Sequence, residues 1–228
     1  MKWWLAPVLL FAGCAPTTLA PSILRAEPLN PSEPENRFGI RTGPRLGPSI
    51  SKLKDGTLDE EVGTPIPPEL GVALEYSRAQ PLWRGLSAHL AVQCEVMYAI
   101  PFPGLSASGG LSYRWQFGPV SIAPALAGRA GTDFGISVAT TPGSFFGGDF
   151  GVSISAAEGD VARLGITPFV SAWRSFDPRT RVLDTGFFPG AMLFARFRSY
   201  ELLVGFGRMF VGGHSWNVPL IGVRYGGN

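Results

Sequence analysis

The chain has 228 residues, a formal net charge of +2 and only 16% charged residues, against roughly 25% in an ordinary soluble domain. This balance excludes the basic surface that nucleic-acid binding requires, and the length suffices for one domain once a leader is removed. Lysine occurs only at positions 2, 52 and 54, so the chain lacks the Lys with which soluble β-proteins protect exposed strand edges.

Residues 1–13 are predicted to form an export signal that is removed. Lys2 gives a short positive start, the run from Trp3 to Phe11 is apolar, and two small residues follow. That order is typical of a secretory signal. The apolar run has about half of the roughly 20 residues that a membrane-spanning helix needs, so a span is not expected here.

The end of this signal, Phe11-Ala12-Gly13-Cys14, resembles the lipobox of bacterial lipoproteins. The resemblance implies cleavage before Cys14 and attachment of lipid to its sulfur and its new amino group. Several acyl chains together anchor a protein stably. Ala15 takes the place of the Asp that often retains lipoproteins at the inner membrane. We therefore expect a lipid anchor in the outer membrane, with an ordinary cleaved signal as the alternative.

Residues 14–36 are predicted to be a disordered tether, because they are rich in Pro, Ser, Thr and Glu and cannot bury a core. Residues 37–69 are predicted to be a charged, turn-rich linker with a possible first strand at Phe38–Thr42. If Cys14 carries lipid, Cys94 has no disulfide partner and is expected to be a small buried or lipid-facing apolar residue.

Residues 70–228 are predicted to form a β-barrel, because long segments alternate between apolar and polar residues. From Leu105 to Phe117 the odd positions are Leu, Ala, Gly, Leu, Tyr, Trp and Phe, while the even positions are small or polar. Segments of about ten alternating residues are typical of transmembrane barrels, whereas globular strands usually have about five or six. The predicted strands cover residues 70–78, 86–96, 105–117, 119–130, 146–156, 161–175, 186–198, 200–211 and 216–225. Prolines 124, 168, 189 and 219 are expected to need bulges or strand ends, because Pro removes a ladder donor.

The connections predict a small antiparallel up-and-down transmembrane barrel of eight to ten strands, with ten slightly preferred. Tight turns alternate with longer joins, as in barrels whose short turns face the periplasm. The tight turns lie at 118–119, 158–160 and 198–199, and the longer joins at 99–104, 131–143 and 176–185. Nine strands follow residue 70, and a single exported chain should have an even number. Phe38–Thr42 would supply the tenth; if one weak segment is not a strand, eight remain.

The apolar sides of these strands are predicted to face lipid and the polar sides the barrel interior. The polar sides are rich in Ser, Gly and Ala, which suit a narrow interior, and aromatic residues lie near segment ends, as in interfacial girdles. Charges of both signs can pair across strands inside a barrel. The predicted interior polar residues are Glu75, His89, Glu95, Arg114, Arg129, Asp149, Arg163, Arg196 and Glu201. A soluble lipocalin-like barrel would have the opposite orientation.

No residue pattern indicates catalysis, a metal or another cofactor. The only histidines in the sequence, His89 and His214, are far apart and have no Cys or carboxylate at ligand spacing. Some outer-membrane lipid A deacylases are small barrels that use His, Ser and a carboxylate, and His214-Ser215 resembles part of such a site. Adjacent residues on a strand face opposite ways, however, and no carboxylate follows them.

The sequence thus predicts a lipid-anchored outer-membrane barrel of structural, scaffold or narrow-passage type, without catalysis. Outer-membrane lipid and envelope proteins are the expected partners, and no cofactor is expected. Eight to ten strands leave an interior largely filled by side chains, so a wide pore is not expected. The alternatives are a soluble, lipid-tethered periplasmic barrel that binds an apolar ligand, and a membrane-embedded lipid hydrolase.

Overall fold

The computed structural model describes residues 17–18, 33–46, 53–54, 57–58, 69–97, 100–133, 144–158, 162–177, 182–211 and 213–227. The regular structure in this part of the chain is all β-strand. The strands are β1 (Thr17–Thr18), β2 (Glu35–Leu46), β3 (Leu53–Lys54), β4 (Thr57–Leu58), β5 (Glu69–Trp83), β6 (Leu86–Met97), β7 (Ile100–Tyr113), β8 (Trp115–Phe117), β9 (Val120–Asp133), β10 (Ser144–Glu158), β11 (Ala162–Asp177), β12 (Val182–Phe197), β13 (Tyr200–Val211) and β14 (His214–Gly227). No helix among these residues is long and apolar enough to cross a membrane. The expected export signal and Cys14 lie outside the described residues.

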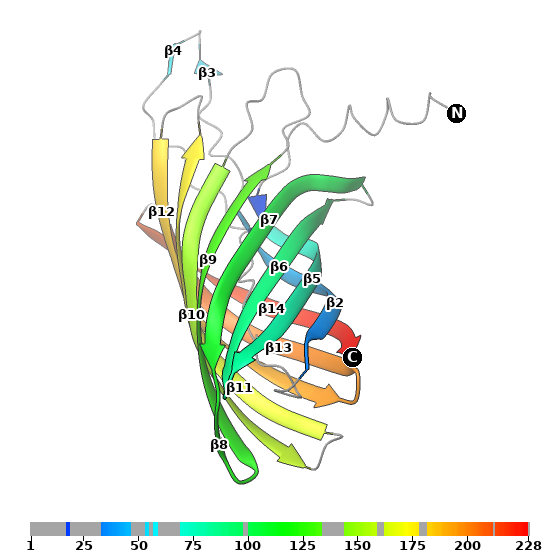
Figure 1. The fold of residues 1–228 in the computed structure, drawn as a ribbon. Coiled ribbons are helices and arrows are strands. Elements are labelled where there is room, and N and C mark those ends of the chain that lie inside the picture. Colours follow the sequence, from blue (N-terminus) through cyan, green and yellow to red (C-terminus); the bar gives the residue numbers. More distant parts are fainter. Residues whose placement is uncertain are drawn as a thin grey trace, which may run out of the picture.

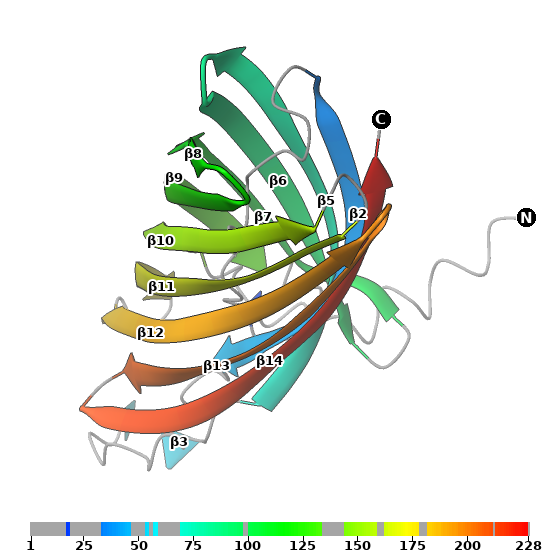
Figure 2. The same ribbon diagram turned by 90° about the horizontal axis from the view of Figure 1, so that it is seen from below.

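Ten long strands form one closed antiparallel barrel, which confirms the predicted all-β up-and-down architecture. Each strand of the ring pairs with the next along the chain, and β14 pairs back with β2. Figure 2 shows the sheet curving round until these two strands lie side by side. β8 continues β7 past a break at Arg114 and prolongs the hairpin with β9 at the bottom of Figure 1. β1 pairs with β2 without belonging to the ring, and β3 pairs only with β4.

The first strand of the ring is β2, which contains the predicted segment Phe38–Thr42. It begins at Glu35, within the segment expected to be tether. β2 begins this early because its side chains already alternate there. Glu35 and Arg37 are buried, whereas Phe38, the residue after Arg37, is exposed. The alternation that defines the barrel strands therefore starts before the composition changes.

The two ends of the barrel differ in their connections. The turn end has the start of β2, the end of β14 and the joins 84–85, 118–119, 159–161 and 198–199. The loop end has the joins 47–68, 98–99, 134–143, 178–181 and 212–213. The predicted tight turns at 118–119 and 198–199 are confirmed, and Gly118 adopts a φ of 58° that favours glycine. The long joins expected at 99–104 and 176–185 are wrong in extent, because strand pairing continues to Ile100 and Asp177.

The apolar sides of the strands face outward and the polar sides face the interior, as the alternation predicts. On β9, Leu126 is 64% exposed while its neighbours Ala125 and Ala127 are 9% and 5% exposed. On β13, Leu202 is 50% exposed while the adjacent Glu201 is 2% exposed. In a water-soluble barrel these exposures would be reversed.

The interior has two unlike halves, which the sequence patterns did not reveal. β12 to β14 point mostly bulky apolar side chains inward, whereas β5 to β9 point mostly Ser and Ala inward. β10 and β11 add Phe145, Phe169 and Trp173 to an inward side that is otherwise small or polar. The expectation of an interior lined by small polar residues is therefore wrong for β12 to β14, which carry large apolar residues on both sides. The bulky cluster consists of Phe145, Phe169, Trp173, Phe188, Met192, Phe194, Leu203, Met209, Val218 and Leu220.

The prolines at positions 124, 168, 189 and 219 do not produce the expected bulges. Pairing continues through Pro124, which lies opposite Val152, and through Pro219, which lies opposite Phe206. At positions 168 and 189 the ladder is interrupted and then resumes in the same register. Register shifts occur instead in β5 near Pro81 and in β6 beside Val96. A long strand tolerates one missing donor because the ladder on either side holds its register.

Candidate functional site

A network of buried ion pairs crosses the interior at the strands that close the barrel. Its first centre is Glu75 on β5, whose carboxylate contacts Arg41 on β2 and, at 2.9 Å, Arg224 on β14. Gln93 Nε2 donates a 2.9 Å hydrogen bond to the same carboxylate, and Ser106 Oγ donates to Gln93 at 3.3 Å. The Glu75 side chain is 1% exposed, so these groups take the place of water around its charge.

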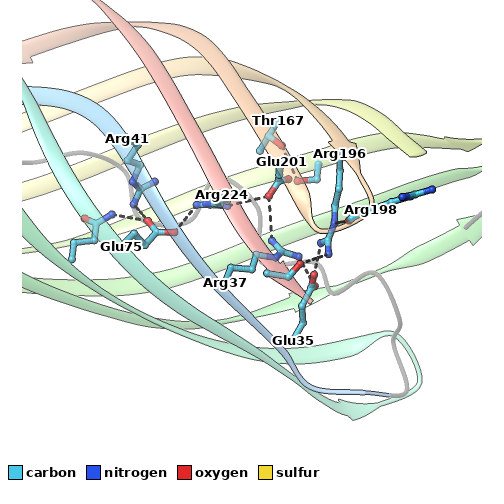
Figure 3. Close-up of polar contacts among 12 residues, drawn as sticks. Glu35, Arg37, Arg41, Glu75, Thr167, Arg196, Arg198, Glu201 and Arg224 are labelled. Atoms are coloured by element: carbon cyan, nitrogen blue, oxygen red, sulfur yellow. Dashed lines mark hydrogen bonds and ion pairs between the residues drawn. The ribbon is translucent and has the colours of Figure 1, made fainter. Parts of the chain in front are cut away.

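The network continues through two more glutamates toward the turn end (Figure 3). Glu201 lies 3.8 Å from Arg224 and 3.7 Å from Arg37. Arg37 also donates to Glu35 at 2.6 Å, and Arg196 pairs with the second oxygen of Glu35. Each of the three carboxylates thus contacts two guanidinium groups, and Figure 3 shows these side chains pointing toward one another. Such mutual pairing is the condition under which buried charges are tolerated.

The network lies where backbone pairing is shortest. β14 and β2 pair over six positions, from Gly222 opposite Arg41 to Gly227 opposite Asn36, whereas β13 and β14 pair over twelve. The side chains of Arg41 and Arg224 come from the two sides of this short ladder and meet on Glu75. The ion pairs therefore strengthen the contact between β2 and β14, where the ring closes.

A second buried polar cluster joins β9, β10 and β11. Arg129 Nη2 lies 3.4 Å from Asp149 Oδ1 and donates a 2.8 Å hydrogen bond to Ser171 Oγ, which in turn donates to Asp149. The Arg129 guanidinium also lies over the ring of Phe145, 5.6 Å from its centroid.

The structure brings most of the predicted interior residues into the barrel. The buried ones are Glu75, His89, Arg129, Asp149, Arg163, Arg196 and Glu201. Arg114 is half-buried at the break between β7 and β8, where its backbone N–H donates to the carbonyl of Gly85 at 2.8 Å. The side chain of Glu95 lies outside the described residues. His89 belongs to neither charged cluster and packs against Gly110.

Sequence reasoning missed four of the seven charged residues in the ion-pair network of β2, β5, β12, β13 and β14, called the closing network below. The missed charged residues are Glu35, Arg37, Arg41 and Arg224, all of them buried. The signal that could have found them is the same two-residue alternation, because Arg41 follows the outward Ile40 and Arg224 stands between Val223 and Tyr225. Glu35, Arg37 and Arg41 were missed because they precede residue 70, where the predicted barrel begins.

Bulky interior side chains lie across glycines of the neighbouring strand. A Cβ added at Gly186 would overlap the indole of Trp173, and one added at Gly207 would overlap the ring of Phe188. Gly131, Gly165 and Gly190 face Phe145, Phe194 and Phe169 in the same way. This packing accounts for part of the high glycine content, because the ring from one strand occupies the place of the missing side chain on the next.

The substitution Gly186→Ala is expected to lower the free energy of unfolding by about 1–3 kcal/mol, the usual cost of overpacking an interior. Trp173 is 2% exposed, so an added methyl group would have to displace a buried indole. Gly128→Ala is the matched control, because nothing lies within 4 Å of a Cβ at that position. Urea unfolding followed by tryptophan fluorescence measures both variants, and equal stability of the two would contradict the proposed packing.

The His214-Ser215 pair does not form a catalytic arrangement. Ser215 Oγ accepts hydrogen bonds from Arg208 at 3.2 and 2.8 Å, and the ring of His214 stacks on Trp216 with centroids 5.9 Å apart. A serine nucleophile needs a base within hydrogen-bond reach, and a guanidinium has no acceptor for its proton. Within the part of the chain that the structure describes, no group of three His, Cys, Asp or Glu residues could hold a metal ion.

The described interior side chains hold the strands of the barrel together. The interior charges are engaged with one another, and the apolar half of the interior is packed. No protein-family model matches the chain, and no curated protein matches it.

Proposed function

We propose that the protein is a lipid-anchored outer-membrane β-barrel of structural, scaffold or narrow-passage type. The observation that carries this proposal is the apolar outer face. Leu193, Phe206 and Ile221 on three neighbouring strands are 57%, 55% and 51% exposed, and similar residues continue around the ring. Soluble monomers rarely expose contiguous apolar patches larger than a few hundred Å², whereas such a surface is what hydrocarbon solvates.

The height of the apolar face supports a membrane location. Every outward position of β12 from Phe187 to Phe197 is apolar. Ten residues at about 3.3 Å each, tilted by about 40°, give roughly 25 Å, the height of the apolar band in transmembrane barrels. Arg208, an outward charge on β13, is hydrogen-bonded to Ser215 toward the loop end. Near a membrane boundary, a long charged side chain is expected to extend its charged group toward the nearer end of the barrel.

Aromatic side chains near the turn end support the same location. An outward row runs in register across five adjacent strands and consists of Phe197, Tyr200, Tyr225, Phe38 and Tyr76. The rings of Tyr200 and Tyr225 lie 5.1 Å apart, and those of Phe38 and Tyr76 lie 4.9 Å apart. Tyr and Trp are enriched where a barrel wall meets the headgroups, because one part of the ring is apolar and another polar.

Burial of the interior favours a structural or narrow-passage role over a wide pore. Phe188 and Met209 point inward and are 0% exposed, and Ser171 is equally buried. The side chains lining a water-filled channel would remain accessible to solvent. The alternative of a soluble, ligand-binding barrel requires a polar outer face, whereas the outward positions of these strands are mostly apolar. The alternative of a lipid hydrolase has no supported nucleophile, because Ser215 is engaged by Arg208.

Semi-native electrophoresis of the membrane fraction tests the location. The unboiled protein is expected to migrate differently from the boiled protein, and sodium carbonate is expected to leave it in the membrane, because a closed barrel unfolds only on heating and its outer face is solvated by lipid. Extraction by carbonate without a mobility shift would point to the soluble alternative. Solubility without detergent after deletion of residues 1–20 would select that alternative outright.

We expect Cys14 to carry the lipid anchor, as the lipobox resemblance implies. Cys14→Ser is expected to abolish incorporation of labelled palmitate, while the heat-dependent mobility shift of the barrel persists because the ring of strands begins only at Glu35. Cys94→Ser is the matched control, because Cys94 is the half-buried cysteine of β6 in the barrel wall. Palmitate incorporation into the Cys14→Ser variant would assign the lipid to another position or overturn the anchor.

A further inference from the structure

Two exposed arginines at the turn end have no carboxylate partner in the part of the chain that the structure describes. Arg78 on β5 and Arg198 in the join 198–199 are both exposed. The Arg78 guanidinium donates to Gln80 Oε1 at 3.3 Å, and the Arg198 guanidinium lies over the ring of Phe197, 5.4 Å from its centroid. Glu33, which precedes β2, is the only acid among the described side chains that is exposed. By contrast, each arginine of the closing network contacts a carboxylate.

Both arginines lie just beyond the outward aromatic row that runs from Phe197 to Tyr76. Arg198 directly follows Phe197, and Arg78 is two residues past Tyr76 on the same side of β5. Two residues of a strand tilted by about 40° advance about 5 Å along the barrel axis. The headgroup layer is about 5–7 Å thick on each side of the hydrocarbon. With the aromatic row at the edge of the hydrocarbon, Arg78 therefore lies in the headgroup layer, where the lipid phosphates are.

Arg78 has a second group of donors beside it on the neighbouring strand. Asn36 of β2 lies directly opposite Arg78 in the ladder, and both are on the outward side. The Tyr76 hydroxyl donates a 2.9 Å hydrogen bond to Asn36 Oδ1, which leaves the two N–H groups of the amide without a partner among the described residues. Opposed residues of antiparallel strands have Cβ atoms about 4.5–5.5 Å apart. One phosphate can therefore accept hydrogen bonds from the guanidinium and the amide together.

We propose that Arg78, Asn36 and Tyr76, called the headgroup site below, bind the phosphate of an anionic phospholipid. The guanidinium supplies the positive charge, the Asn36 amide supplies neighbouring donors, and the Tyr76 hydroxyl fixes that amide. The headgroup of a zwitterionic phospholipid carries an ammonium that the guanidinium repels, so an anionic lipid is favoured. One exposed arginine at a membrane surface favours the anionic lipid about fivefold. The site requires the barrel to lie in a membrane, so it rests on the proposed function.

The surface next to the headgroup site favours a lipid over a free phosphate ion. Leu74 lies two residues before Tyr76 on the same side of β5 and is 44% exposed. Ile40 lies opposite Leu74 on β2 and is 55% exposed. Acyl chains attached to a phosphate at the site would cover these side chains and remove apolar surface from water or detergent. A free phosphate ion would gain nothing from them.

The other exposed arginines lack this combination of charge, amide and aromatic ring. Arg208 donates twice to Ser215, and Arg174 has no amide side chain opposite it on either neighbouring strand. Arg84 lies in the join that follows β5, past the end of the aromatic row. Arg198 shares the charge of Arg78, but it lies in a turn. Arg174, toward the loop end, therefore serves as the matched control for Arg78.

Short-range fluorescence quenching in lipid vesicles tests the headgroup site. A bimane label is attached to Val92→Cys in the full chain carrying Cys14→Ser and Cys94→Ala, because Val92 lies opposite Tyr76 on the outward side of β6. Phosphatidylglycerol and phosphatidylcholine, each with a nitroxide near the top of one acyl chain, are compared in phosphatidylcholine vesicles. Half-maximal quenching is expected at an about fivefold lower mole fraction of the labelled phosphatidylglycerol.

Substitutions at the two ends of the barrel separate the headgroup site from a general attraction of anionic lipid. Arg78→Gln is expected to remove the difference between the two lipids. Arg78→Lys is expected to keep part of it, because an ammonium retains the charge but not the paired donors of a guanidinium. Arg174→Gln is expected to leave the difference unchanged, because the nitroxide quenches only a label close to it. The heat-dependent mobility shift of each variant verifies that its barrel is closed.

The outcomes distinguish failure of the headgroup site from failure of the proposed function. Equal quenching by the two lipids in the chain with Arg78 intact would overturn the headgroup site and leave the membrane barrel standing. An equal loss of the difference in Arg78→Gln and Arg174→Gln would also overturn the site, since the attraction would then not be local. Quenching by neither lipid would overturn the membrane location and the site together.

Discussion

Replacing Glu75 by Gln is expected to lower the free energy of unfolding by about 3–5 kcal/mol, the usual cost of removing one partner from a buried ion pair. Glutamine keeps the size of the side chain but leaves Arg41 and Arg224 without the carboxylate that both contact. Each guanidinium is 3% exposed, so water cannot replace the lost charge. Urea unfolding of the barrel in lipid vesicles, followed by tryptophan fluorescence, measures the loss.

Two further variants separate this charge effect from general disruption. Arg208→Gln removes an exposed guanidinium outside the barrel and is expected to change stability by less than about 1 kcal/mol. Glu75→Leu combined with Arg41→Leu removes an acid and a base together, so it is expected to be less destabilised than Glu75→Gln. If Glu75→Gln unfolds at the same urea concentration as Arg208→Gln, the closing network does not stabilise the contact between β2 and β14.

The antiparallel barrel of eight to ten strands was predictable because its determinants are local. A single sequence shows the two-residue alternation and the tight turns, and a closed exported barrel requires an even number of strands. The extent of strand pairing was less predictable. β7 continues to Ile100 through two prolines, because pairing with β6 depends on a partner strand and not on the propensity of the segment itself.

The two-sided interior was not predictable from polarity. Alternation distinguishes inside from outside only where one side is polar, and in β12 the inward Phe188 is as apolar as the outward Phe187. Which side of such a strand faces inward is decided by register with its neighbours, and register is fixed by the turns and by the closure of the ring.

Which carboxylate pairs with which guanidinium in the charged network depends even more strongly on how the ring of strands closes. Glu75 and Arg224 are separated by most of the barrel sequence and meet only because β14 returns to β2. Alternation could have identified the buried charges on β2 and β14, as it did for Arg196 and Glu201. It could not have assigned a carboxylate to each guanidinium, since that requires the three-dimensional ring.

Leu126→Arg is expected to destabilise the barrel in lipid vesicles by about 2–4 kcal/mol, because a guanidinium midway along a lipid-facing strand must leave water. Leu126 is 64% exposed and lies near the middle of β9. At such an exposed position in a soluble protein, the same substitution would alter stability by no more than about 0.5 kcal/mol. Gln116→Arg is the matched control, because Gln116 is exposed in β8 at the turn end, where a charge reaches the headgroups and costs about 0–1 kcal/mol. The difference between the two variants, and not either value alone, reports depth in a bilayer. If Leu126→Arg is as stable as Gln116→Arg in vesicles, the exposed apolar face is not solvated by hydrocarbon, and the outer-membrane proposal fails while the closed barrel remains.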